Sequence, residues 1–260
     1  MKNILDLSVF TTGNKDNPPV LFIHGFPFDH YMWDEQVKKI SRGHYCITYD
    51  VRGLGSSPRG DGQFTMESFV DDLENIIDNL SPDKPTLCGL SMGGYISLRA
   101  VERMEEKLSA LILCDTKSLA DTNEGKVNRA RGIKQINEEG ADKFVEQFIS
   151  NCFAEKFKRE CKVEYETIVN SAKSYDAVGL KGCLLAMAGR TDTTSYLSKI
   201  SIPTLVICGE EDNLTPPEVM KSMSDKIRNS IFVTIKGAGH LSPVEEPVTV
   251  NAEIEKFLNK

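Results

Sequence analysis

A serine flanked by glycines in residues 89–94 (GLSMGG) has the residue types and the spacing for nucleophilic catalysis. The segment follows the apolar run 86–88 and precedes a helix-compatible stretch. In such a strand–turn–helix context the serine occupies a sharp, strained turn, and the glycines leave room for strand and helix to cross. The helix N-terminus then favours negative charge that develops near the Ser91 hydroxyl. A glycine-rich turn with an incidental serine is the alternative interpretation.

A base must remove the proton from a serine hydroxyl, and the chain offers 4 histidines. His240 lies in residues 237–243, directly after the apolar run 231–235. Because the sites of parallel α/β sheets gather at the carboxyl ends of strands, we predict that His240 is the base. His30 and His44 close no strand, so we expect surface or turn positions for them.

A carboxylate must orient the histidine, and two loops offer candidates. Glu210, Glu211 and Asp212 follow one strand-like run, and Asp115 closes another. Asp212 is favoured because residues 213–217 (NLTPP) form a turn into a helix that begins at proline, which constrains the loop. Asp115 is the main rival. With Asp212, the order along the chain is Ser, Asp, His.

The elements that must position these residues follow from the apolar pattern. Short apolar runs are continuous rather than alternating, which predicts strands covered on both faces. Helix-like patterns separate the runs, so we predict a mostly parallel, doubly wound α/β sheet. The strand-like runs are residues 20–23, 46–49, 86–88, 110–114, 204–208 and 231–235.

The alternation stops between about residues 118 and 195, where one helical pattern follows another. A helical segment between two strands of one sheet is more simply a cap over the strand ends than an independent domain. We therefore predict a first part of the core at residues 1–117, a helical cap at 118–195, and a second part of the core at 196–260.

Taken together, five segments resemble the α/β-hydrolase superfamily, and the resemblance covers nearly the whole chain. Residues 187–217 are most similar to its 3-oxoadipate enol-lactonase-like branch, which shades into carboxylesterases and cofactor-free haloperoxidases. The five segments are residues 24–27 (HGFP), 50–57 (DVRGLGSS), 89–94 (GLSMGG), 209–217 (GEEDNLTPP) and 237–243 (GAGHLSP).

This resemblance implies an α/β-hydrolase fold, a mostly parallel doubly wound sheet with a helical cap inserted. The family usually opens with a hairpin of two strands, but residues 4–10 offer only one clear strand before Val20. We therefore expect seven strands or an abbreviated eighth. The family's order of elbow serine, acid and histidine matches Ser91, Asp212 and His240. A serine at the elbow argues against the epoxide hydrolase and haloalkane dehalogenase branches, which would require aspartate there.

The resemblance also implies an oxyanion hole made by the backbone N–H groups of Met92 and Phe26. It favours a structural role for His24, which would shape the loop by hydrogen bonds. Phe26, Met187 and Arg190 are the candidates for substrate binding. Arg190 could bind a substrate carboxylate, or it could pair with a local acid such as Asp192.

These residues predict a serine hydrolase that cleaves a small-to-medium ester, thioester or lactone through an acyl-enzyme intermediate. Fold-level analogy leaves three alternatives open, namely a carbon–carbon bond hydrolase, a cofactor-free perhydrolase, and a slow-turnover ligand receptor of the same fold. The predicted chemistry needs no metal ion and no organic cofactor.

The composition and charge of the 260-residue chain limit the classes of partner that we expect it to bind. The net charge of -7 argues against binding to nucleic acid or to an anionic membrane surface, because a protein that binds either of these usually presents a basic patch. No apolar run approaches the roughly 18 residues of a membrane span. We expect a cytoplasmic protein with a small-molecule substrate, and a homo-oligomer stays open. The 7 cysteines are odd in number and irregularly spaced, so reduced, mostly buried thiols are expected rather than disulfides or a metal site.

Overall fold

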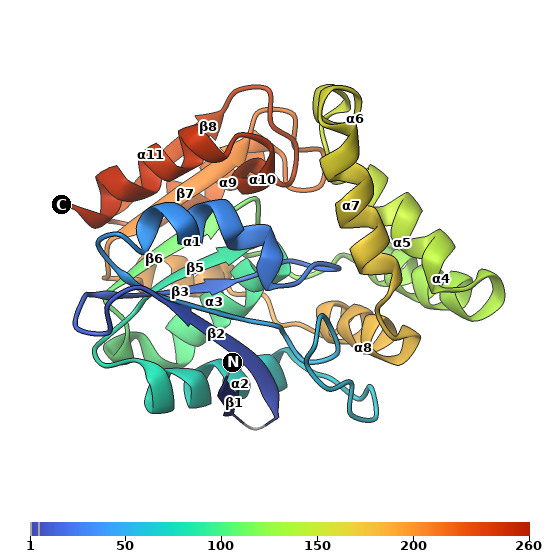
Figure 1. The fold of residues 1–260 in the computed structure, drawn as a ribbon, viewed down its shortest axis with the longest axis horizontal. Coiled ribbons are helices and arrows are strands. Elements are labelled where there is room, and N and C mark those ends of the chain that lie inside the picture. The colour runs from blue at the N-terminus through green and yellow to red at the C-terminus, as the bar shows by residue number, and fades with distance from the viewer. Residues whose placement is uncertain (1, 5) are drawn as a thin grey trace.

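The computed structural model describes residues 2–4 and 6–260. In this part of the chain, one sheet of 8 strands has the order β1-β2-β4-β3-β5-β6-β7-β8 (Figure 1). β1 and β2 form an antiparallel hairpin, β2 pairs antiparallel with β4, and the remaining pairs are parallel. The predicted mostly parallel sheet is therefore confirmed. The strands are β1 (Lys2–Ile4), β2 (Leu7–Thr12), β3 (Pro19–Ile23), β4 (Tyr45–Tyr49), β5 (Thr86–Leu90), β6 (Ala110–Cys114), β7 (Thr204–Gly209) and β8 (Ser230–Ile235).

Helices cover both faces of the sheet, with α1 and α11 along one side and α2 and α3 along the other (Figure 1). The sequence explains where α2 begins, because the Thr65 side chain caps its first turn by accepting a hydrogen bond from the Ser68 N–H at 3.1 Å. The helix buries a stripe that includes Phe69 and Leu73. The core helices are α1 (Asp34–Ile40), α2 (Met66–Leu80), α3 (Met92–Met104), α9 (Pro217–Ser224), α10 (Ser242–Glu245) and α11 (Pro247–Leu258), with short 3-10 turns η1 (His30–Trp33), η2 (Glu105–Lys107) and η3 (Thr194–Lys199).

The expected abbreviated eighth strand is present: β1 has 3 residues and ends at Ile4, β2 begins at Leu7, and Asp6 lies between them with a φ of 66°. Residue 5 lies outside the described residues. The expectation that the strands are covered on both faces is wrong for β8, which lies at the edge of the sheet, where Ile231 is exposed. The order of the strands in space determines which strand lies at an edge of the sheet. The apolar run of a strand does not show this order.

Five helices separate β6 from β7, and we call them the helical insert: α4 (Asn123–Glu139), α5 (Ala141–Ser150), α6 (Glu155–Glu160), α7 (Lys162–Lys173) and α8 (Ala177–Ala188). They gather beyond one end of the sheet (Figure 1). The ring of Phe26, in the loop after β3, packs edge-on against Phe148 of α5 with ring centroids 5.2 Å apart. The exact division of the chain at residues 118 and 195 stays a prediction. No helix in the described residues is long and apolar enough to cross a membrane.

Candidate active site

Ser91 lies at the sharp turn between β5 and α3, with backbone angles of φ 53° and ψ -111°. Positive φ is strained for a residue with a side chain. The flanking glycines make the turn possible, since a Cβ on Gly89 would collide with the carbonyl oxygen of Gly93. A Cβ on Gly93 would in turn collide with the carbonyl of Ile23 in β3. The sequence therefore needs glycine on both sides to expose the Ser91 hydroxyl.

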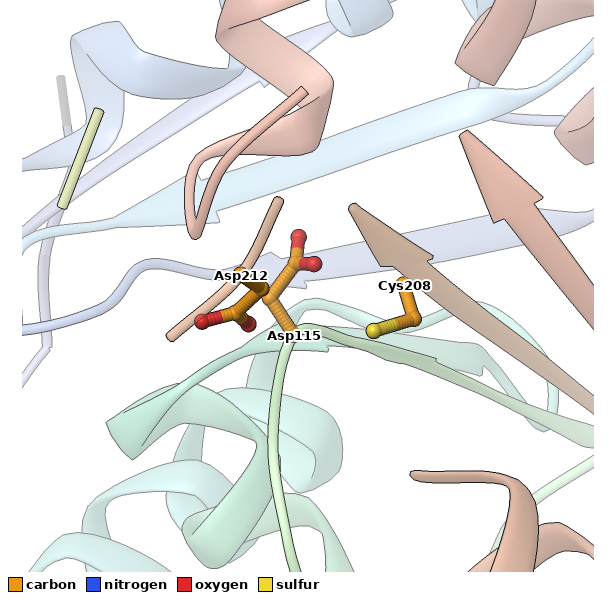
Figure 2. Close-up of side chains that lie close together, drawn as sticks. All are labelled: Asp115, Cys208 and Asp212. Atoms are coloured by element: carbon orange, nitrogen blue, oxygen red, sulfur yellow. The ribbon is translucent and has the colours of Figure 1, made fainter. Parts of the chain in front are cut away.

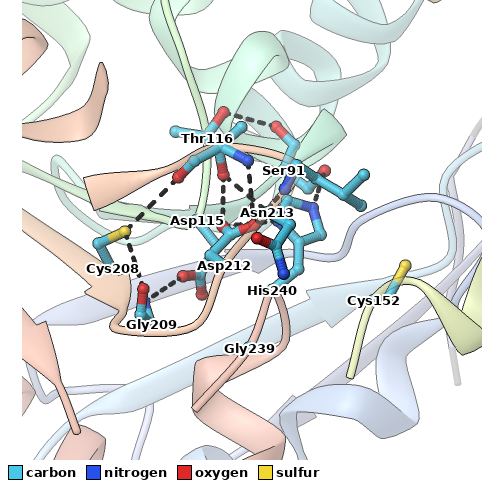
Figure 3. Close-up of polar contacts among 12 residues, drawn as sticks. Ser91, Asp115, Thr116, Cys152, Cys208, Gly209, Asp212, Asn213, Gly239 and His240 are labelled. Atoms are coloured by element: carbon cyan, nitrogen blue, oxygen red, sulfur yellow. Dashed lines mark hydrogen bonds and ion pairs between the residues drawn. The ribbon is translucent and has the colours of Figure 1, made fainter. Parts of the chain in front are cut away.

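The structure brings Ser91, His240 and Asp212 together from three different loops (Figure 3). The His240 Nε2 atom lies 2.8 Å from Ser91 Oγ, and its Nδ1 atom lies 2.8 Å from Asp212 Oδ2. His240 is buried, and its backbone N–H donates to the carbonyl of Cys152 at 2.8 Å. In this geometry the Ser91 hydroxyl donates to Nε2 while Nδ1–H donates to Asp212, which is the arrangement required of a general base and its orienting acid.

Asp212 is held as a buried carboxylate by four hydrogen-bond donors. Its Oδ1 atom accepts from the backbone N–H groups of Leu214 at 2.8 Å and Thr215 at 3.0 Å. Its Oδ2 atom accepts from the Thr215 hydroxyl at 2.6 Å and faces His240. Burial alone would raise the pKa of Asp212, but the neighbouring His240 and these donors outweigh it and lower the pKa to about 2. The side chain is therefore ionised at any pH near neutrality.

Asp115, the rival acid, lies beside Asp212 but bonds to other groups. Its Oδ1 atom accepts from the Gly209 N–H at 2.7 Å, and its Oδ2 atom accepts from the Ser242 hydroxyl at 2.6 Å. Burial, together with the charge of Asp212, raises the pKa of Asp115 well above its ordinary value. Asp115 thus ties the end of β7 to the start of α10, while Asp212 occupies the position against the imidazole.

Asp115, Asp212 and the β7 residue Cys208 form a buried group whose ligand-type atoms all lie within 4.8 Å of one another (Figure 2). These residue types can ligate cations. Here, however, the carboxylate oxygens already accept the hydrogen bonds described above. Burial, followed by the charge of Asp115, raises the pKa of the Cys208 thiol, which keeps it protonated. The donor set therefore fits a hydrogen-bonded cluster better than a metal site.

The two backbone donors expected for an oxyanion hole flank the Ser91 turn. Met92 is the first residue of α3, and Phe26 lies in the loop after β3. Neither backbone N–H donates to another residue that the structure describes. Buried His24 shapes this loop: its Nε2 accepts from the Val51 N–H at 2.8 Å, and its Nδ1 lies 2.9 Å from the carbonyl of Gly25. Burial lowers the pKa of His24, which fits a neutral, structural imidazole.

A cavity of about 330 Å³ opens beside Ser91 and His240. Phe26 and Met187, two of the predicted substrate-binding residues, line it together with other apolar side chains of the helical insert. Charged and polar side chains also line it. Apolar lining residues include Phe144, Phe148 and Leu184, and polar ones include Lys117, Asp121, Asn128 and Arg129.

Arg190, the third predicted substrate-binding residue, lines a small neighbouring hollow rather than this cavity. Its Nη1 donates to Asp121 Oδ1 at 2.8 Å, and its Nη2 donates to the carbonyl of Leu119 at 2.8 Å. Its guanidinium also lies 4.1 Å from the ring centroid of Tyr95. The acid that Arg190 pairs with is thus Asp121, not Asp192, and these bonds hold both Nη atoms inside the protein, while the buried Nε atom has no hydrogen-bond partner among the described residues.

A larger cavity of about 580 Å³ lies away from Ser91, between α7 and the η1 and α10 segments. Near its wall, the Tyr175 hydroxyl of the insert donates to Asp29 Oδ2 at 2.6 Å. The Asp29 Oδ1 atom accepts from the Tyr31 N–H at 2.9 Å, so this contact joins the insert to the loop that carries Phe26. The pair could not be predicted from the sequence, because the two residues are 146 positions apart.

Comparison with known proteins places the chain in a family. The family described as alpha/beta hydrolase fold matches residues 18–247, which is most of the chain. The chain belongs to the alpha/beta hydrolase fold family. The fold expected from the sequence resemblance is therefore confirmed.

Several known proteins are similar to the chain over nearly its whole length. An esterase from Thermogutta terrifontis, solved with malate bound, is 37% identical with a TM-score of 0.93, and the match covers 97% of this chain and 93% of the esterase. The 3-oxoadipate enol-lactonase 2 of Acinetobacter baylyi is 26% identical, over 98% of this chain and 93% of its own. The enol-lactonase from Burkholderia xenovorans LB400 is 23% identical with a TM-score of 0.91, covering 98% and 96%, a likeness of fold.

Proposed function

We propose that the protein is a serine hydrolase that cleaves small-to-medium esters, thioesters or lactones, with Ser91 as nucleophile, His240 as base and Asp212 as orienting acid. The observation that carries the proposal is the continuous hydrogen-bonded series from Ser91 Oγ through His240 to Asp212, with 2.8 Å at each contact. The positive φ of Ser91 adds support, since strain of this kind is typical of a nucleophile elbow.

In the proposed first half-reaction, Ser91 Oγ attacks the substrate carbonyl carbon while its proton passes to His240 Nε2. The carbonyl oxygen becomes an oxyanion that accepts hydrogen bonds from the N–H groups of Met92 and Phe26. The bond to the leaving alcohol or thiol then breaks, and that group takes the proton from His240. With a lactone, the released hydroxyl stays attached to the acyl group.

In the second half-reaction, His240 removes a proton from water, and the resulting hydroxide attacks the acyl carbonyl. The Ser91 ester bond breaks, the acid leaves, and Ser91 regains its proton from His240. Asp212 stays ionised throughout, because its pKa of about 2 lies far below neutral pH. Its negative charge stabilises the transient imidazolium of His240. Each oxyanion donor is expected to contribute about 2.7–4 kcal/mol to the transition state.

The relatives and the cavity support an ester or lactone as the substrate. Relatives that align along almost the whole chain carry the names esterase and enol-lactonase. The cavity of about 330 Å³ beside Ser91 suits a small acyl group with an apolar part against Phe26 and Met187. We also propose that the helical insert acts as a cap, because α4, α5 and α8 contribute side chains to this cavity.

Hydrolysis of p-nitrophenyl butyrate by the whole protein tests the proposal. The kcat of the Ser91→Ala variant should fall by at least about 10³-fold, because His240 and Asp212 are ineffective without the nucleophile. Ser97→Ala is the matched control, because Ser97 lies in the same helix and its hydroxyl donates to the Gly93 carbonyl at 2.8 Å rather than to His240. A Ser91→Ala variant as active as the Ser97→Ala control would refute the assignment.

A further inference from the structure

The loop that carries His240 is bonded to the helical insert as well as to the sheet. We propose that Glu245 is a positioning residue for His240, whose carboxylate fastens the His240 loop, residues 236–241, to the α5–α6 turn of the insert, residues 151–154. The position of the base at Ser91 therefore depends on the docked insert. The proposal rests on the proposed function and adds to it a residue that does not line the cavity beside Ser91.

The Glu245 carboxylate accepts three hydrogen bonds from backbone N–H groups. Glu245 is the last residue of α10 and is buried. Its Oε1 atom accepts from Gly239 at 3.0 Å and from Leu241 at 3.2 Å, which are the two neighbours of His240 in the chain. Its Oε2 atom accepts from Ala154 of the α5–α6 turn at 2.9 Å. One side chain thus binds both neighbours of the base and the insert.

The backbone of His240 contacts the same turn directly. Its N–H donates to the carbonyl of Cys152 at 2.8 Å, and Figure 3 shows Cys152 together with Gly239 and His240. The three consecutive N–H groups of residues 239–241 therefore all bond to Glu245 or to the insert. Because buried backbone groups need partners, the loop cannot move away from the insert without leaving such groups unpaired.

Close packing joins the same two segments. A Cβ on Gly239 would lie 2.6 Å from the Ala154 nitrogen and 3.0 Å from the carbonyl carbon of Phe153, so only glycine allows this approach. The Phe153 ring in turn stacks on Phe157 of α6, with centroids 4.9 Å apart, and meets Tyr165 of α7 edge-on at 5.5 Å. These rings fix the turn to the insert, so a displacement of the insert is transmitted to the His240 loop.

The charge of Glu245 indicates a specific purpose, since a buried carboxylate without a cation costs free energy. Glu245 has no lysine or arginine partner among the described residues. Burial raises its pKa, although the three N–H donors and the neighbouring His240 oppose this. A carboxylate offers two acceptor oxygens and no donor, and here one oxygen serves the His240 loop while the other serves the insert.

The Glu245→Gln variant tests the proposal because it keeps one oxygen and replaces the other by a donor. The amide oxygen can still accept from Gly239 and Leu241, but the NH₂ group then faces the N–H of Ala154 and loses the bond to the insert. We expect kcat for p-nitrophenyl butyrate to fall by about ten- to a hundredfold with KM little changed, since a catalytic group misplaced by about 1 Å has an effect of this size. The rate at which a fluorophosphonate labels Ser91 should fall by the same factor.

Glu246→Gln is the matched control. Glu246 is the next residue and also contacts the insert, through an ion pair with Lys156 of α6 at 3.4 Å near the surface. Its side chain does not bond to the His240 loop, so kcat should stay within about twofold.

Gly239→Ala separates the same two segments by steric contact and changes no charge. Both kcat and the labelling rate should fall again. The double variant of Gly239→Ala and Glu245→Gln should be little worse than the poorer single variant, because both disrupt one junction. Independent effects would multiply instead, and that result would contradict the proposal.

Hydrogen exchange, followed by mass spectrometry, provides a readout that needs no turnover. Peptides that contain residues 239–241 and 151–154 should exchange faster in Glu245→Gln than in Glu246→Gln. This result, in a protein that neither hydrolyses esters nor reacts with the fluorophosphonate, would sink the proposed function and keep the link between loop and insert. A Glu245→Gln variant with unchanged kcat and labelling rate would overturn the role of Glu245 and leave the hydrolase proposal standing. Activity that falls only in proportion to the unfolded fraction, measured by urea unfolding, would overturn that role as well.

Discussion

Replacing Asp212 by asparagine changes a few atoms and should abolish most of the activity. The amide oxygen can still accept the backbone N–H groups of Leu214 and Thr215, which now bond to Oδ1 at 2.8 and 3.0 Å. The amide nitrogen then replaces Oδ2, which faces His240 Nδ1 at 2.8 Å. An NH₂ group donates, so Nδ1 must accept, and the ring proton moves to Nε2, where it blocks proton transfer from Ser91.

The expected loss is about 10⁴-fold in kcat, typical of a triad left in the wrong tautomer, or about 5 kcal/mol of transition-state stabilisation. Folding should suffer much less, by about 1–3 kcal/mol, because charge-assisted hydrogen bonds become neutral ones. The folded pKa of about 2 lies below the unfolded value near 3.9, so Asp212 stabilises the fold above about pH 4. That contribution, and hence the stability gap to Asp212→Asn, should shrink as the pH falls toward 2.

The assay is steady-state hydrolysis of p-nitrophenyl butyrate, with urea unfolding at several pH values on the same samples. Asp115→Asn is the matched control, because the same chemical change is made in a neighbouring buried carboxylate that bonds to Gly209 and Ser242. We expect this control to keep kcat within about tenfold. If Asp115→Asn were the inactive variant and Asp212→Asn the active one, the rival acid would be correct and our reading of the site wrong.

Further variants test the packing around the site. Tyr175→Phe removes the buried hydrogen bond to Asp29 and should destabilise the protein by about 1.5–3 kcal/mol in urea unfolding, and an unchanged midpoint would show that the contact contributes nothing. Gly93→Ala places a Cβ against the Ile23 carbonyl and should cost about 1–3 kcal/mol, so a fully stable variant would contradict the close crossing of β3 and α3. Of the 7 cysteines, Cys161 alone is not fully buried. Ellman's reagent should therefore label this thiol rapidly in the native protein, and rapid labelling of a second thiol would show that the core opens.

Local patterns predicted the elements that carry the site. The apolar run of β6 appears at Ala110–Cys114 as expected, and the strand–turn–helix around Ser91 is also present. These features depend on periodicity and on glycine spacing, which residues close together in the chain determine. The prediction that His240 would meet Ser91 needed one further assumption, that parallel strands end at the same edge of the sheet.

Features that depend on pairs of residues far apart along the chain could not be predicted from the sequence. The partner of Arg190 is Asp121, 69 positions away, whereas the nearer Asp192 was the expected acid. The sequence left the number of strands open between seven and eight, because the 3 residues of β1 are too few to show a period.

The central claim is that Ser91 is the activated nucleophile, and covalent labelling tests it most directly. The protein is treated with a fluorophosphonate, digested, and examined by tandem mass spectrometry, with the urea-unfolded protein and His240→Ala as controls. We predict one adduct, on the peptide containing Ser91, that forms in the native protein and is strongly suppressed in both controls. A folded protein whose Ser91 stays unlabelled, or one labelled equally with and without His240, would contradict the account.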